Sequence, residues 1–118
     1  MSTIERKKRV PVSFEIVFDD GDGFMTGPVI DMSETGCFIE TVMPLEAGKR
    51  VRLTPLLTGE SGIFELEGEV VRKQDYDLDH HFDRTPGMGI RFVDPDGGQL
   101  EHVRRLLASL DAAADKKS

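Results

Sequence analysis

The chain lacks the features that mark several classes of protein. It has no tryptophan, one tyrosine and one cysteine among 118 residues. With Cys37 alone, an intrachain disulfide is excluded. No apolar run approaches the roughly 18 residues that a membrane-spanning helix needs, and no apolar signal segment follows the basic N-terminus. We therefore expect a cytoplasmic protein without membrane insertion.

The length and the charge of the chain narrow the range of possible functions further. A chain of 118 residues with 38% hydrophobic and 31% charged side chains is typical of one globular domain. The net charge of −7 argues against general binding of DNA or RNA. Residues 1–10 nevertheless hold one acid and four basic side chains, Arg6, Lys7, Lys8 and Arg9. A basic arm on an acidic body suits a small anion better than a long polyanion, although a solubilising tail is an alternative.

Alternation of apolar and polar residues predicts strands. In residues 10–18, one face carries apolar side chains and the other carries Pro11, Ser13 and Glu15, which is the period of a half-buried strand. Turn-forming clusters rich in glycine, aspartate or proline separate this segment from further strand-like segments. The predicted strands are residues 10–18, 24–32, 37–42, 50–55, 63–73 and 88–92.

A change of period follows the last predicted strand. Apolar residues then recur at steps of three and four, which predicts an amphipathic helix on Leu100, Val103, Leu106, Leu107 and Leu110. The preceding Asp94-Pro95-Asp96 supplies a cap, a first-turn proline and a carboxylate near the positive helix end.

The order of these elements predicts a mainly all-β fold. Six short strands and one helix, without strand–helix alternation, indicate a six-stranded antiparallel β-barrel with a C-terminal α-helix. Residues 1–9 are predicted to be a flexible basic arm, 10–111 the barrel with its helix, and 112–118 a disordered tail.

One motif combines groups that a nucleobase can use. Asp31-x-Ser33-x-x-Gly36 occupies a predicted strand–turn–strand junction. Asp and Ser can bond nearby backbone and Gly permits a positive φ, so a well-formed turn is one explanation. Ligand binding is the other, because the N1–H and N2 amine of guanine suit a carboxylate, while its O6 and N7 suit an arginine fork from the arm.

An ordered set of motifs resembles the PilZ domain family of bacterial cyclic di-GMP receptors, over about residues 5–108. The matching segments are Arg9-Val10-Pro11-Val12, Asp31-x-Ser33-x-x-Gly36-Cys37-Phe38-Ile39-Glu40, Pro44-Leu45, Gly48-x-x-Val51-x-Leu53, Leu66-Glu67-Gly68-Glu69-Val70-Val71 and Gly87-Met88-Gly89-Ile90-x-Phe92. The family fold is a six-stranded antiparallel barrel with a C-terminal helix, as the periodicity also predicts.

The resemblance implies a signalling protein that binds cyclic di-GMP, needs no cofactor, and passes its ligand state to an unidentified effector protein. Control of motility or surface behaviour is the implied process. The second family motif is complete, but the first, two arginines separated by three residues, has Glu5 at its first position and Arg9 at its second. The implied ligand-binding residues are therefore Arg6, Arg9, Asp31, Ser33 and Gly36, with additional phosphate contacts from Lys7 and Lys8.

The incomplete arginine motif leaves a second interpretation open. The chain would then be a degenerate PilZ-like adaptor that acts by protein–protein interaction without binding cyclic di-GMP. An enzyme is not expected, because the sequence offers no convincing nucleophile–base pair, acid pair or metal set.

The remaining patterns favour structural roles. Asp75-x-Asp77-x-Asp79 begins like a calcium loop, but His80 and Pro86 replace its required glycine and glutamate, which excludes an EF-hand. We expect a solvated acidic loop there rather than a metal site built on its histidines. Cys37 is expected to be a small buried hydrophobic residue. The pair Gly87 and Gly89 is expected to lie in a strand rather than in a phosphate loop.

Overall fold

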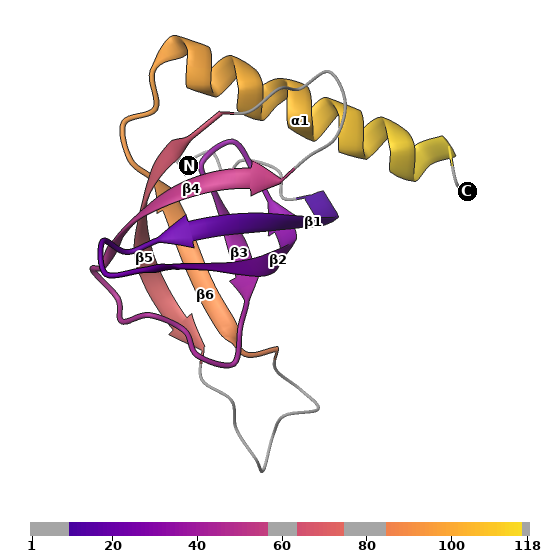
Figure 1. Cartoon of the computed structure of the whole chain (residues 1–118). Coiled ribbons are helices and arrows are strands. Elements are labelled where there is room, and N and C mark those ends of the chain that lie inside the picture. Colours follow the sequence, from indigo (N-terminus) through magenta and orange to yellow (C-terminus); the bar gives the residue numbers. More distant parts are fainter. Residues whose placement is uncertain (1–9, 57–63, 75–84, 117–118) are drawn as a thin grey trace, which may run out of the picture.

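The computed structural model of the chain describes residues 10–56, 64–74 and 85–116. The predicted arm at 1–9 and the predicted acidic loop at 75–83 lie outside the described residues. The described elements are β1 (Val10–Asp19), β2 (Phe24–Met32), β3 (Gly36–Glu40), β4 (Arg50–Leu56), β5 (Leu66–Gln74), β6 (Gly87–Phe92) and α1 (Gly97–Lys116) (Figure 1).

The strands close into a barrel in the order β1-β2-β3-β6-β5-β4. Every neighbouring pair is antiparallel, and β1 closes the ring by pairing with both β2 and β4. Closure removes the unpaired backbone groups that an edge strand would expose. The predicted fold class is confirmed, and Figure 1 shows α1 lying across one end of the barrel.

Apolar side chains fill the barrel. The inward-facing residues of all six strands, with Phe64 just before β5 and part of α1, form one core: Ile16, Phe18, Val29, Met32, Cys37, Ile39, Val51, Leu53, Phe64, Leu66, Val70, Met88, Ile90, Phe92, Val103 and Leu106. At Gly68 a Cβ would lie 2.6 Å from Ile90 Cγ2 and 3.0 Å from Leu53 Cδ1. The interior at this level therefore has no room for one more methyl group.

A reciprocal cap starts α1. The N–H of Gln99 donates to Asp96 Oδ1, and the N–H of Asp96 donates to Gln99 Oε1, each at 2.8 Å. The cap is thus Asp96, and the prediction of Asp94 as the cap was wrong. Gln99 three residues after Asp96 completes a capping box, whereas Asp94 has a φ of 42°.

The helix is also fixed to the barrel by side-chain contacts. Val103 and Leu106 are buried in the core, and the Gln99 side chain donates to the Glu65 carbonyl at 2.8 Å. The rings of His102 and Phe64 stack with their centroids 4.8 Å apart.

The helical backbone of α1 continues to Lys116, into the segment for which a tail is predicted. None of the helical segments described is both long and apolar enough to cross a membrane.

Two strand ends differ from the sequence prediction by more than one residue. β3 ends at Glu40 rather than at residue 42, because Thr41 accepts the N–H of Met43 on Oγ1 at 3.1 Å, which forms a turn. The Thr41 N–H donates across to the Pro86 carbonyl at 3.1 Å, just beyond the last paired residues of β3 and β6. β5 begins at Leu66 rather than at residue 63.

Candidate functional site

Four outer positions line up across neighbouring strands. Asp31 of β2 pairs with Phe38 of β3, Phe38 pairs with Gly89 of β6, and Gly89 pairs with Arg72 of β5. Pro11 of β1 extends the row beyond Asp31. Directly opposed residues of antiparallel strands lie within interaction range, so the register brings a carboxylate, an aromatic ring and a guanidinium to one face of the barrel.

A cavity of about 390 Å³ lies on this row. Its volume falls within the range of about 300–1,000 Å³ that small-molecule sites occupy. The residues that line it are Asp31, Cys37, Phe38, Val71, Arg72, Gly89 and Ile90. The cavity therefore combines a ligand-sized volume with a carboxylate and a cation.

Phe38 and Arg72 form one wall of the cavity. Phe38 is buried, but its chain neighbours Cys37 and Ile39 belong to the barrel core, so the Phe38 ring points to the outer side. The Arg72 Cζ atom lies 5.5 Å from the centroid of this ring, within the range of a cation–π contact. This contact holds a flat guanidinium surface next to the cavity.

Ser33 has its contacts within the turn rather than in the cavity. The residue is 1% exposed. Its hydroxyl accepts the Thr35 N–H at 3.2 Å and lies 3.1 Å from Thr35 Oγ1, while its own N–H donates to the Gly36 carbonyl at 2.8 Å. Ser33 thus stabilises the β2–β3 turn, and it is not among the cavity-lining residues.

Gly36 is required for a different reason than the sequence indicates. Its φ is not positive, since Gly21 and Gly48 alone among the described glycines have positive φ, so the prediction from backbone freedom was wrong. A Cβ on Gly36 would instead collide with the backbone carbonyl of Ile90. The glycine permits β3 and β6 to approach each other where the motif turn joins the barrel.

The same turn is bonded to two other elements. The Thr35 carbonyl accepts the Phe92 N–H of β6 at 2.9 Å. Glu34 Oε1 accepts a hydrogen bond from Nε of Arg104 in α1 at 3.2 Å. The motif between Asp31 and Gly36 is thereby connected to the end of β6 and to the helix.

The basic residues predicted for the site, Arg6, Lys7, Lys8 and Arg9, lie outside the described residues. Val10 pairs with Met32 and Pro11 with Asp31. The chain therefore enters the barrel directly beside the motif.

Sequence reasoning missed Arg72. No motif marks this residue, and its position depends on a register shift between Val70 and Arg72 in the β5–β6 pairing. The shift brings Arg72 opposite Gly89, in line with Asp31. Alternation along β5 alone could not predict which outer residues of another strand it would meet.

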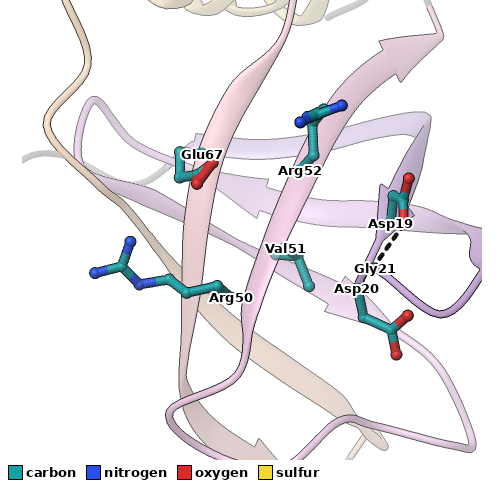
Figure 2. Close-up of a pocket in the computed structure, with 7 residues that line it drawn as sticks. All are labelled: Asp19, Asp20, Gly21, Arg50, Val51, Arg52 and Glu67. Atoms are coloured by element: carbon teal, nitrogen blue, oxygen red, sulfur yellow. Dashed lines mark hydrogen bonds between the residues drawn. The ribbon is translucent and has the colours of Figure 1, made fainter.

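A second cavity, also of about 390 Å³, lies at the β1–β2 turn and carries both signs of charge. It is lined by Asp19, Asp20, Gly21, Arg50, Val51, Arg52 and Glu67 (Figure 2). Arg52 pairs with Asp19 on one side and with Glu67 on the other. Figure 2 shows Arg50 extending away from Asp20. Acidic side chains flank the two arginines of this cavity, so it is less suited to an anion than the cavity at Asp31.

Metal ligation finds no support in the described part of the chain. Within the described ranges, no group of three or more His, Cys, Asp or Glu side chains is arranged to hold an ion. The histidines of the predicted acidic loop, His80 and His81, lie outside those ranges. Cys37 is 1% exposed on the barrel interior, as its apolar surroundings predict.

The chain is thus a small antiparallel barrel that carries a cavity of ligand size on its outer face. Residues 4–109 match the family model described as PilZ domain. This match covers most of the chain, so the chain belongs to the PilZ domain family, as the motifs predict. No curated protein matches the chain.

Solved structures of low sequence identity share the fold. The PilZ domain of YcgR from Escherichia coli, described as holding c-di-GMP, superposes with a TM-score of 0.76 at 20% identity, covering 96% of this chain and 95% of that one. The PilZ domain of CeSA from a cellulose-synthesizing bacterium gives 0.66 at 20% identity, covering 88% and 98%. MotI/DgrA of Bacillus subtilis, described as an inhibitor of motility, gives 0.70 at 16% identity, covering 98% of this chain and 54% of that one.

Proposed function

We propose that the chain is a non-enzymatic, cytoplasmic receptor that binds cyclic di-GMP on the outer face of the barrel and passes its ligand state to a partner protein. The observation that carries the proposal is the row from Asp31 to Arg72, which surrounds a cavity of about 390 Å³ with a carboxylate, an aromatic ring and a guanidinium. The YcgR domain of the same fold is described with this ligand bound.

Each part of the site has a chemical task in this proposal. The Asp31 carboxylate accepts the N1–H and N2 amine of a guanine. Arg9, with Arg6, supplies a fork to O6 and N7, and Lys7 and Lys8 attract the phosphates.

The remaining residues either hold the turn in place or add a further contact surface to the site. Ser33 and Gly36 act indirectly, by holding the turn that fixes Asp31. The Arg72 guanidinium, held over the Phe38 ring, offers a flat cationic surface to a base or a phosphate.

The incomplete arginine motif sets the expected affinity. Glu5 stands where the family pattern has an arginine. Loss of one bidentate contact of about 1–3 kcal/mol corresponds to a roughly five- to 150-fold weaker affinity. We therefore expect binding that is weaker than in a receptor with both arginines, with Arg72 supplying part of the missing cationic contact.

Isothermal titration with cyclic di-GMP tests the proposal. The wild-type chain should bind, and Asp31→Ala and Arg9→Ala should each weaken binding by about fivefold or more. Glu101→Ala, which removes an exposed acid on α1, should bind like wild type. The absence of both heat and a thermal shift at about 100 μM ligand would contradict a receptor function.

The alternative is an adaptor that works without the ligand, and Glu5 in place of the first arginine favours it. The regulated process we propose is motility or surface behaviour, in line with the description of MotI. In the native host, Arg6→Ala combined with Arg9→Ala should reproduce the swimming or surface phenotype of a deletion if the chain is a receptor. An intact phenotype in that double variant would favour the adaptor.

A further inference from the structure

Two β-bulges flank the proposed ligand cavity, one on β5 and one on β2. Val70 and Arg72 of β5 pair with consecutive residues of β6, so Val71 between them is the extra residue of a bulge. Val70 is fully buried, whereas Val71 and Arg72 are both exposed. Strict alternation after Val70 would turn Arg72 back toward the barrel interior. The bulge therefore places two consecutive side chains on the outer face.

The bulge on β2 has the same effect on Asp31. Val29 and Asp31 pair with consecutive residues of β3, so Ile30 is the extra residue. Val29 and Met32 both face the core, whereas Asp31 lines the outer cavity. Bulges are frequent beside functional sites because they re-aim side chains. The two bulges thus bring the Asp31 carboxylate and the Arg72 guanidinium to the same face of the barrel.

The bulge on β5 also adds an apolar side chain to the cavity. Three apolar residues that line the cavity, Cys37, Phe38 and Ile90, are at most 5% exposed, whereas Val71 is 52% exposed. Val71 is therefore the apolar side chain of the cavity that a ligand can cover most. A single exposed valine is ordinary on a protein surface, but this one lies in a cavity between a carboxylate and a cation.

Gly89 forms a flat floor beside this valine. A Cβ on Gly89 would lie 3.9 Å from Val71 Cγ2 and 3.6 Å from Arg72 Cβ, so both side chains stand next to backbone that has no side chain of its own. The Arg72 guanidinium continues this surface over the Phe38 ring. A flat heteroaromatic ring can lie on such a surface and cover the valine methyl groups, whereas a phosphate gains nothing from them.

The row of paired residues orients such a ring. Asp31 and Gly89 are two strand spacings apart, roughly 10 Å of sheet, with Phe38 between them. A guanine whose N1–H and N2 amine are held by Asp31 therefore directs its imidazole ring over Phe38 toward Gly89 and Val71.

We propose that Val71 is a ligand-contacting residue that covers the imidazole end of a guanine, so that the cavity binds a purine base and not the phosphates alone. The inference rests on the proposed function, because the base belongs to cyclic di-GMP. It deepens that function by assigning the apolar half of the contact to a residue that the bulge of β5 brings to the outer face.

Isothermal titration of the full chain with cyclic di-GMP is the first test. Val71→Ala removes two methyl groups that the base would cover and should weaken binding by about threefold or more. Val71→Thr, which keeps the shape, should weaken it to a smaller extent. The matched control is Val42→Ala, because Val42 is 69% exposed and lies away from the cavity-lining residues. Its affinity should stay within about twofold of wild type.

A nuclear Overhauser effect between the protein and the ligand is the second test. With valine methyl groups labelled and cyclic di-GMP at saturation, the Val71 methyl groups should show cross-peaks to guanine H8, and those of Val42 should show none. This measurement reports contact rather than stability. A loss of less than threefold in Val71→Ala, or the absence of any cross-peak from Val71 to the base, would overturn the proposal.

The same samples separate this inference from the receptor function. Wild-type binding together with an unchanged affinity in Val71→Ala contradicts the Val71 contact and leaves the receptor function standing. Absence of binding to the wild-type chain at about 100 μM ligand contradicts both. Val71→Ala should melt close to wild type, since its side chain is exposed. If it does not, the cross-peaks of the wild-type chain decide.

Discussion

At the scale of single residues, two glycines of neighbouring strands are under different constraints. Gly36 begins β3 and faces the Ile90 carbonyl, where a Cβ has no space. Gly89 in the middle of β6 would place a Cβ 3.6 Å from Arg72 Cβ, which is an ordinary contact. One glycine permits strands to approach, and the other leaves the outer cavity open.

Alanine at these two positions should therefore have different effects. Gly36→Ala forces backbone apart and should lower the free energy of unfolding by about 1–3 kcal/mol or more. Gly89→Ala should change it by less than about 1 kcal/mol, although it narrows the cavity. Urea denaturation followed by circular dichroism measures both, and equal losses would contradict the steric account.

Arg72 provides a second prediction for a single residue. Arg72→Ala should weaken cyclic di-GMP binding by roughly fivefold or more, with Arg72→Lys retaining only part of the affinity because it lacks the flat guanidinium. Arg91→Ala is the matched control, since that arginine pairs with Glu69 on the outer surface. Titration calorimetry gives the comparison, and an unchanged affinity in Arg72→Ala would remove this residue from the site.

At the scale of elements, the capping box determines where α1 begins. Asp96→Ala should lower the free energy of unfolding by about 1 kcal/mol, because two backbone donors at the helix start lose their partners. Glu101→Ala, further along the same helix, should cost less than about 0.5 kcal/mol. Thermal melts of both variants measure the difference, and a similar cost at the two positions would contradict the cap.

The β1–β2 turn carries a dependence on pH. Backbone N–H groups lower the pKa of Asp20 in the folded chain, so its contribution to stability is present above the unfolded pKa and is lost as pH falls through the folded pKa. Carboxyl chemical shifts should give Asp20 a pKa below 3.8. In Asp20→Asn this contribution to the pH dependence should disappear, and a pKa at or above 3.8 would contradict the assigned hydrogen bonds.

Most elements could be predicted from the sequence, because their periods are regular and their boundaries carry turn residues. The alternation in β1 and the three- and four-residue spacing in α1 are local patterns. The end of β3 was misplaced because the apolar alternation of the sequence runs on to Val42, whereas the Thr41 hydroxyl accepts the Met43 N–H and turns the chain after Glu40. The cap was misplaced because both Asp94 and Asp96 satisfy the sequence rule.

The site could be predicted only in part. Asp31, Ser33 and Gly36 are close in sequence, and their motif identified the turn. Which outer residues of β5 and β6 face Asp31 depends on register, including one shift, and register follows from the packing of the whole barrel. The contribution of Arg72 thus appears only once the strands are paired.

At the scale of the whole molecule, ligand binding should stabilise the fold. A ligand that binds the folded chain alone adds about 2.7 kcal/mol at a concentration 100 times its dissociation constant. For a domain of this size the melting temperature should rise by about 10 °C. Asp31→Ala should reduce the shift at the same ligand concentration, as differential scanning fluorimetry would show; an equal shift in that variant would point to a different site.

Ring closure limits how such a molecule can respond. Every strand has two partners, and β1 is held by β2 on one side and β4 on the other. An open sheet can fray from its outermost strand, but release of β1 requires two ladders to break at once. Amide exchange in β1 should therefore approach the rate of global opening. If a ligand binds on the outer face as proposed, the motion that it causes should therefore be confined to the turns and the helix, while the ring stays fixed.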